Sequence, residues 1–152
     1  MYETTKTETP GSSTTEQNKN LMRKAVEEIW NRGNFDNLED MVSEDFVIHF
    51  PREGEEIRGP GNVKQFYTDL RKAFPDLHFT IFDLVAEGNK VVTHWSATGT
   101  HKGEFKGVPP TGKSVTFQAM DIDKISNGKY VECWTNVDEL GLMQQLGVIP
   151  GK

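Results

Sequence analysis

The sequence predicts an α+β domain in which helices pack on one face of a curved, mainly antiparallel sheet. Helix-type spacing of apolar residues is concentrated in the first half of the chain, whereas alternating segments rich in Val, Ile, Phe, Thr and Trp fill most of the second half. Short turn sequences containing Gly and Asn, at 87–89 and 126–128, join neighbouring alternating segments as hairpins. Helices followed by hairpin-linked strands are typical of the α+β class.

Three helices are expected before the main run of strands. Each shows apolar residues three and four positions apart, with polar residues between them. They cover residues 21–30, 35–42 and 63–74. The Asn-Arg-Gly-Asn sequence at 31–34 breaks the first helix, and Pro75 prevents the third from continuing. A short last helix is expected after Asp138, a residue type suited to capping, and to end at Gly147.

Five segments have the composition and alternation of strands. They cover residues 45–50, 77–86, 90–100, 114–125 and 129–137. Several carry apolar side chains on both faces, so neither face is plainly water-exposed. A sheet curled around a cavity, or one whose outer face is buried against a second subunit, accounts for this pattern. The sequence therefore predicts one pocket and a homodimer formed through the outer face of the sheet.

The domain organisation follows from where apolar residues begin. The first twenty residues contain six Thr, two Ser and a Pro-Gly pair, and only Met1 and Tyr2 are apolar, too little to offset the entropy of ordering the segment. Residues 1–16 are therefore expected to be a disordered tail. Residues 17–152 are expected to form a single domain, because a chain of 152 residues with 35% apolar content can build one core.

Charge and composition argue against several classes of partner. With 17 Lys and Arg against 23 Asp and Glu, the net charge of −6 repels phosphate backbones, so no nucleic-acid partner is expected. The longest apolar runs, 46–48 and 84–86, are far shorter than the roughly twenty residues that span a membrane, so no membrane association is expected. The single cysteine, Cys133, and a polar opening without the pattern of a signal peptide favour a cytoplasmic protein.

The sequence contains none of the short motifs whose known mechanism would identify a function. The four His show no HExxH or other ligand spacing, no CxxC pair is present, and neither a phosphate-binding loop nor a dinucleotide glycine fingerprint follows a strand. Cys133 lies in an apolar setting that is typical of core packing. No metal ion or cofactor is therefore expected. The remaining class of chemistry is acid/base catalysis by His and carboxyl groups that line an apolar hollow.

Candidates for this chemistry come from the strands and their ends. His49 interrupts an apolar strand, His101 ends a long strand before a Gly- and Pro-rich connection, and Asp121 lies in the fourth expected strand. These three are the predicted catalytic residues. The predicted ligand-binding residues come from the last two strands and are Gln118, Trp134, Thr135 and Asn136. Alternation alone leaves open which of these side chains point inward.

Four sequence stretches carry a resemblance to a known family. They are IWNRGN at 29–34, AFPDL at 73–77, the block from GTHKG to GVPPTGK at 99–113, and LGLMQQLG at 140–147. Together they resemble the SnoaL-like polyketide cyclase family, whose members are also called ester cyclases, with spacing that agrees over residues 19–148. The resemblance implies the nuclear transport factor 2-like fold, a cone of helices and a strongly curved sheet around one pocket.

The resemblance also implies a reaction. Cyclases of the family close a ring by intramolecular aldol condensation, with an acid/base Asp on the last strand and no cofactor. In this chain Thr135 holds that position, directly after Trp134, whereas His101 matches the histidine of the family's GTH motif. Two kinds of function therefore stay open. One is a cyclase, isomerase or lyase acting on a small hydrophobic carbonyl or polyketide-like compound, and the other is a non-catalytic small-molecule binding protein or dimeric interaction module.

Overall fold

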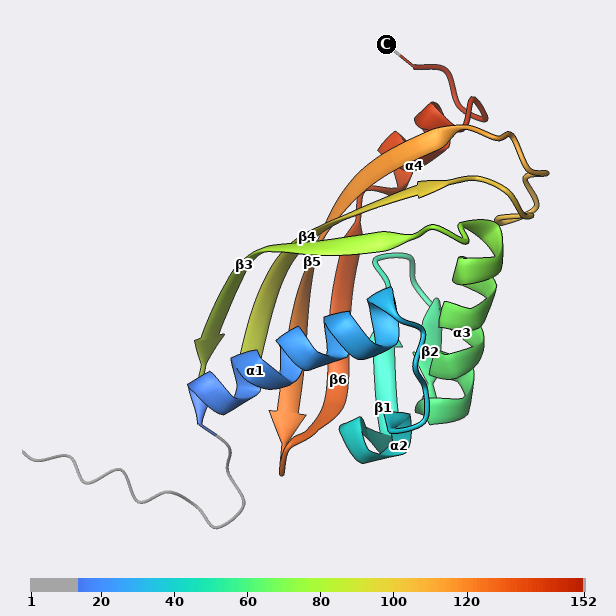
Figure 1. Ribbon diagram of the computed structural model, residues 1–152. Coiled ribbons are helices and arrows are strands. Elements are labelled where there is room, and N and C mark those ends of the chain that lie inside the picture. The colour runs from blue at the N-terminus through green and yellow to red at the C-terminus, as the bar shows by residue number, and fades with distance from the viewer. Residues whose placement is uncertain (1–13, 152) are drawn as a thin grey trace, which may run out of the picture.

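The computed structural model describes residues 14–151, which form one curved sheet with helices on one side (Figure 1). The helical segments are α1 (Thr15–Ala25), a π-helical segment (Val26–Asn31), α2 (Leu38–Met41), α3 (Gly59–Ala73) and α4 (Glu139–Gln145). The strands are β1 (Val42–His49), β2 (Glu56–Arg58), β3 (His78–Glu87), β4 (Lys90–Thr100), β5 (Ser114–Ser126) and β6 (Lys129–Val137). Most of the tail that the sequence predicts, residues 1–13, lies outside the described residues.

The six strands are arranged in the order β2-β1-β6-β5-β4-β3. Neighbours are antiparallel except β1 and β6, which run parallel, so the sheet is mixed. Both expected hairpins are present, and their turns contain Gly88 and Gly128 at positive φ, a conformation that glycine adopts without steric cost. The α+β class predicted from the sequence is confirmed. The edge strand β2 is an addition, because three residues are too few to show alternation.

The helices differ from the expected ones in their bounds. α1 begins at Thr15, because Thr14 and Gln17 form a capping box in which each side chain accepts a hydrogen bond from the other residue's backbone N–H, at 3.1 and 2.8 Å. The sequence assigns residues 14–16 to the tail, yet they cap and begin α1. α2 is limited to four residues, since the chain joins β1 at Val42. No helix within residues 14–151 is long and apolar enough to cross a membrane.

The helices cover one face of the sheet, called here the inner face. α1 lies across β3 and β4, and α3 lies against β1 and β2 (Figure 1). The π-helical segment is fixed on both sides. The Asn31 side chain accepts from the backbone N–H of Phe79 at 2.7 Å and donates to its carbonyl at 3.1 Å, while Arg71 donates to the carbonyls of Trp30 and Asn31 at 2.5 and 2.6 Å. These bonds hold the Trp30 ring over the sheet.

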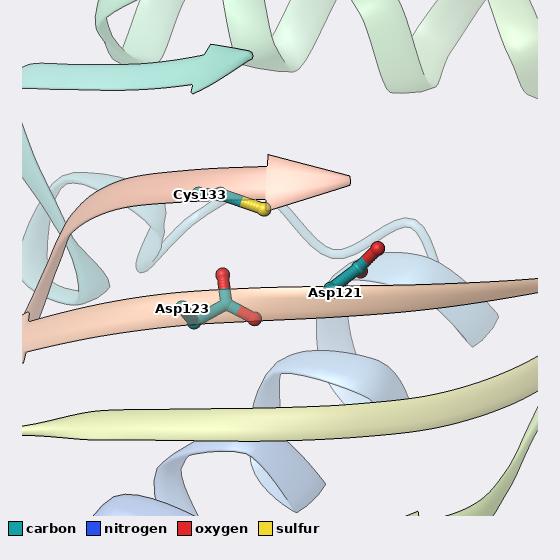
Figure 2. A group of neighbouring side chains, drawn as sticks. All are labelled: Asp121, Asp123 and Cys133. Atoms are coloured by element: carbon teal, nitrogen blue, oxygen red, sulfur yellow. The ribbon is translucent and has the colours of Figure 1, made fainter. Parts of the chain in front are cut away.

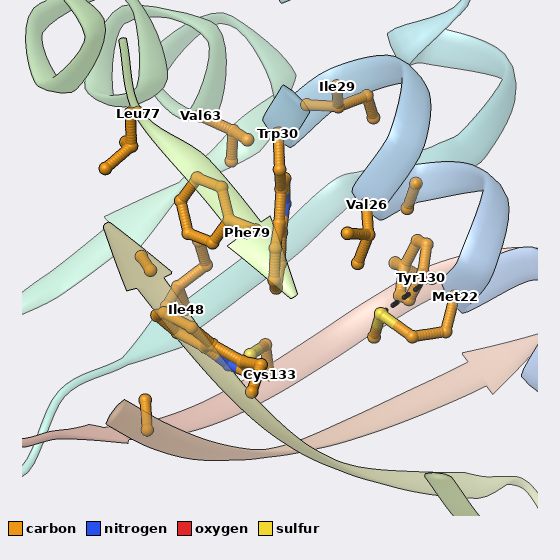
Figure 3. Close-up of a cluster of buried hydrophobic side chains, with 14 of the residues drawn as sticks. Met22, Val26, Ile29, Trp30, Ile48, Val63, Leu77, Phe79, Tyr130 and Cys133 are labelled. Carbon is orange, nitrogen blue, oxygen red and sulfur yellow. Dashed lines mark hydrogen bonds between the residues drawn. The ribbon is translucent and has the colours of Figure 1, made fainter. Parts of the chain in front are cut away.

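Alternation along the strands separates the two faces. On β5 the odd-numbered residues from Val115 to Ile125 are buried, and most of the even-numbered ones are exposed on the opposite, outer face. The inner-face side chains join the helices in one hydrophobic cluster, part of which is drawn in Figure 3 around Trp30, Phe79 and Tyr130. The apolar residues that the sequence places on both faces therefore belong to two different surfaces, a core inside and an exposed patch outside.

Candidate active site

A cavity of about 810 Å³ lies between the inner face of the sheet and the helices. Aromatic side chains make up much of its lining, among them Trp30, Phe66, Tyr67, Phe79, Trp95 and Phe117. The Trp30 ring contacts those of Tyr67, Phe79 and Trp95 with centroid separations of 6.1, 5.0 and 5.5 Å. Cavities of this size and apolar character are typical of sites that enclose small organic molecules.

Asp121 on β5 places a carboxyl group in this apolar lining. The residue is only 3% exposed. Trp95 Nε1 donates a hydrogen bond to Oδ2 at 2.9 Å, and Thr135 Oγ1 donates one to Oδ1 at 2.5 Å. Strand register sets this arrangement, because Thr135 on β6 lies directly opposite Asp121 and Trp95 lies diagonally across on β4. The two donors fix the orientation of the carboxyl group.

The setting of Asp121 suits proton transfer near neutral pH. Burial raises the pKa of Asp121 from 3.8 to about 6, and the hydrogen bonds from Thr135 and Trp95 oppose the rise. The group is therefore mainly ionised at pH 7 but holds a proton more readily than an exposed Asp. A general base is most effective when its pKa lies near the working pH.

Asp123 and Cys133 lie beside Asp121 and project from the same side of β5 and β6 (Figure 2). An oxygen of each carboxyl group and the Sγ of Cys133 lie within 4.8 Å of one another. Burial raises the pKa of Asp123 well above its ordinary value, the charge of Asp121 adds to the rise, and the hydrogen bond from the Cys133 thiol opposes it. Burial also raises the pKa of the Cys133 thiol, which makes it a poor nucleophile.

These three side chains are the one close group of metal-ligand types within residues 14–151, and they fit a metal ion poorly. Both oxygens of Asp121 already accept hydrogen bonds. The raised pKa values of Asp123 and Cys133 mean that protons would have to leave before an ion could bind. We therefore assign no metal ion to the group and treat it as a site that carries protons.

Of the side chains that the sequence predicts for the site, Asp121 and Thr135 meet in the cavity. His101 is fully buried but does not line the cavity. Its Nδ1 accepts a hydrogen bond from the Thr111 N–H at 3.2 Å, and its ring contacts Phe74 with a centroid separation of 5.4 Å. These contacts tie the β4-β5 connection to the end of α3, so the position of His101 indicates a structural role and does not support the catalytic one.

The other four side chains face away from the cavity, because the alternation of their strands directs them to the outer face. His49 Nδ1 lies 3.0 Å from Glu56 Oε1, and its ring stacks on Trp134 at a centroid separation of 5.6 Å. Gln118 and Asn136 line a second, more open hollow of about 620 Å³ on the outer side. The interpretation of these side chains as cavity groups therefore does not agree with the structure, which has this second hollow besides the predicted pocket.

Asp123 and Cys133 line the cavity without being predicted as site residues. The signal for Asp123 is present in the sequence, because it lies two positions after Asp121 and side chains two apart on a strand share a face. Cys133 is expected in the core, and at 6% exposure it is part of the core as well as of the cavity wall. The two-residue spacing of Asp121 and Asp123 is thus the sequence pattern that places both carboxyl groups on one face of the strand.

The structure is that of a small α+β protein whose curved sheet and helices surround an apolar cavity that contains carboxyl groups. The profile of the SnoaL-like polyketide cyclase family matches residues 20–146, and the chain belongs to this family. Aklanonic acid methyl ester cyclase DnrD of Streptomyces peucetius is 27% identical over 129 residues, which cover 84% of this chain and 88% of that protein.

Solved structures of similar proteins have the same fold. TsrD of Streptomyces laurentii is 26% identical, with a TM-score of 0.79 over 90% of this chain and 99% of that one. IdmH of Streptomyces antibioticus is 31% identical, with a TM-score of 0.73 over 87% of this chain and 99% of that one. The family and the fold that the sequence motifs imply are therefore confirmed.

Proposed function

We propose that this protein is a cofactor-independent acid/base enzyme that acts on a small hydrophobic carbonyl or polyketide-like compound held in the cavity. The observation that carries the proposal is the Asp121 carboxyl group, buried among aromatic side chains and oriented by Thr135 and Trp95. Such a group removes a proton from the carbon next to a carbonyl, which begins both aldol cyclisation and isomerisation. The fixed orientation contributes because proton transfer depends on alignment.

The location of Asp121 supports a cyclase-type reaction in which the carboxylate comes from a neighbouring strand. The family resemblance implies an acid/base Asp at the position of Thr135 on β6. The hydroxyl of Thr135 is 2.5 Å from an oxygen of Asp121, so a carboxylate on β5 reaches the region that an Asp at position 135 would occupy. The aklanonic acid methyl ester named for DnrD is therefore a suitable first substrate to test.

Binding without chemistry is a second candidate, favoured by the same departure at Thr135. A hydroxyl group has no accessible pKa for taking a proton from carbon, so the family's usual position lacks an acid/base group. A binding protein needs only the apolar lining and one or two hydrogen bonds. On this account Asp121→Asn, which preserves the shape of the side chain, leaves the function intact.

Proton exchange in D₂O distinguishes the two candidates. The test follows ring closure of aklanonic acid methyl ester and deuterium uptake at the α-carbon of 2-tetralone, a bicyclic aromatic ketone, by NMR. Asp121→Asn is expected to lower the rates by about 10²-fold to 10⁴-fold while both compounds still bind. Asp83→Asn, an exposed position on β3, is the matched control and should behave as the unmodified protein. Binding without exchange above the buffer rate would favour the second candidate.

We propose further that two copies pair through the outer face of the sheet. Six apolar side chains from four adjacent strands are exposed there, namely Phe82, Val85, Val92, Met120, Ile122 and Trp134. The same face of a second copy would cover this patch with twofold symmetry. The one cysteine, a buried free thiol, supports a reducing compartment such as the cytoplasm.

A further inference from the structure

The two carboxyl groups of the cavity have opposite surroundings. Asp121 accepts hydrogen bonds from an indole N–H and a hydroxyl, both of which favour its ionised form. Asp123 is 4% exposed, and its Oδ2 finds no hydrogen-bond partner within residues 14–151. Its neighbour is the Cys133 thiol, a weak donor. The site therefore favours a carboxylate at position 121 and a neutral carboxylic acid at position 123.

We propose that Asp123 is a second catalytic residue, the general acid that gives a proton to the carbonyl oxygen of the substrate while Asp121 removes a proton from the adjacent carbon. The proposal rests on the proposed function, because it requires a carbonyl compound in the cavity. Pairs of carboxyl groups whose environments drive their protonation apart are a general way to combine an acid and a base in one site.

The geometry of the pair fits this division of roles. Both carboxyl groups line the cavity and project from the same side of β5 (Figure 2). Their nearest ligand oxygens are no more than 4.8 Å apart. The α-carbon and the carbonyl oxygen of a ketone are about 2.4 Å apart by standard bond lengths. Because hydrogen-bond reach adds roughly 3 Å on each side, one substrate can touch Asp121 through its α-carbon and Asp123 through its oxygen.

The proton transfers balance without another reactant. The α C–H bond breaks and its proton goes to Asp121, its electron pair forms the enol double bond, and the carbonyl oxygen takes a proton from Asp123. The enol carbon then attacks a second carbonyl of the same molecule. As this carbon–carbon bond forms, the enol proton returns to Asp123 and the new alkoxide takes the proton from Asp121. Both groups end in their starting states.

Titratable groups face Asp123 from its own strand β5, from β6 and from α3. They are Asp121, Cys133, Tyr130 and Tyr67. Burial raises the pKa of both tyrosines, as it does that of the thiol, so these three groups are neutral near pH 7. The other charged residues that line the cavity are exposed or half-buried, namely Glu55, Asp69, Lys72, Glu104, Lys106 and Glu139. Burial is therefore the main influence on the ionisation of Asp123, and Asp121 supplies the charge that adds to it.

Asp123→Asn tests the assignment, because the amide keeps the size and neutrality of the acid but has no proton to transfer. Deuterium exchange into 2-tetralone is measured from pH 5 to 10 in EDTA, which removes any metal-dependent rate. We expect the rate to fall by about 10²-fold or more, the alkaline limb of the profile to disappear, and the affinity for 2-tetralone to stay the same. Thermal unfolding establishes that the variant is folded.

Cys133→Ser supplies a second, graded test. A hydroxyl donates a stronger hydrogen bond to a carboxylate than a thiol does, so the variant should stay active with its alkaline limb moved to lower pH. A purely structural role for Asp123 would not produce this displacement. An unchanged profile in both Asp123→Asn and Cys133→Ser would overturn the proposal, and so would loss of the wild-type rate in EDTA.

The outcomes for the two carboxyl groups are distinguishable. Inactive Asp121→Asn together with fully active Asp123→Asn would refute the role of Asp123 and leave the proposed function standing. Full activity in Asp121→Asn would refute the proposed function itself. If no ketone is turned over, carbon-13 NMR titration of the Asp carboxyl groups still decides, because an Asp123 that is ionised at pH 7 cannot act as the acid.

Discussion

Thr135→Val removes one of the two donors to Asp121 while keeping the shape of the side chain. The lost hydrogen bond is 2.5 Å long and is made to a group that carries charge near neutral pH. Hydrogen bonds to charged groups contribute about 1.5–3 kcal/mol. Since about 1.36 kcal/mol corresponds to one pH unit, the pKa of Asp121, which is about 6, should rise to roughly 7–8 in the variant.

Carbon-13 NMR of the Asp carboxyl groups measures this change directly, and Asp121→Asn identifies the resonance. The acid limb of the exchange-rate profile should move to higher pH by the same amount, so the variant is slow at pH 6.5 and recovers above pH 8. Thr98→Val, at an exposed position on β4, is the matched control. The reasoning is refuted if Asp121 titrates at the same pH in Thr135→Val as in the unmodified protein.

Three further predictions concern stability and assembly. Because burial raises the pKa of Asp121 from 3.8 to about 6, the folded protein holds a proton that the unfolded chain releases, so this group should lower the free energy of unfolding by roughly 2.5 kcal/mol as the pH rises from 4 to 7. The raised pKa of Asp123 adds a fall of its own, so urea titrations of Asp121→Asn should show a smaller fall than those of the unmodified protein. Gly103→Ala should cost about 1–3 kcal/mol in the same assay, since the added methyl group would meet the Lys72 carbonyl, whereas Gly61→Ala has open space and should cost little. Met120→Asp, at a residue 58% exposed, should convert the proposed dimer to a monomer in light scattering with cavity activity retained, and a monomeric unmodified protein would contradict the dimer.

Much of the fold follows from local sequence patterns. β3 to β6 begin and end within one residue of the expected bounds, because alternation and the turns at 87–89 and 126–128 are short-range features. The parallel pairing of β1 with β6 is long-range and leaves no local signal. The start of α1 depends on two side chains, Thr14 and Gln17, whose capping bonds replace the apolar anchors that the segment lacks.

The site is harder to predict because one bulge changes the phase of β6. Ser126 pairs with Lys129, but Lys124 pairs with Glu132, so one extra residue enters β6 at this point. Counting from the hairpin turn without this bulge would place Trp134 opposite Asp121 and turn it into the cavity. With the bulge, Thr135 takes that place and Trp134 points outward. The bulge in β6 therefore decides that Thr135, and not Trp134, points into the cavity.

A crystal structure with 2-naphthol, a planar mimic of the enol of 2-tetralone, tests the central claim most directly. The account predicts that the ring lies in the 810 Å³ cavity and contacts Trp30 or Trp95. The ring carbon that corresponds to the α-carbon should lie about 3–3.5 Å from an oxygen of Asp121, the separation required for proton transfer. A ligand seated in the outer hollow beside Gln118, or one in the cavity with that carbon remote from Asp121, would contradict the account.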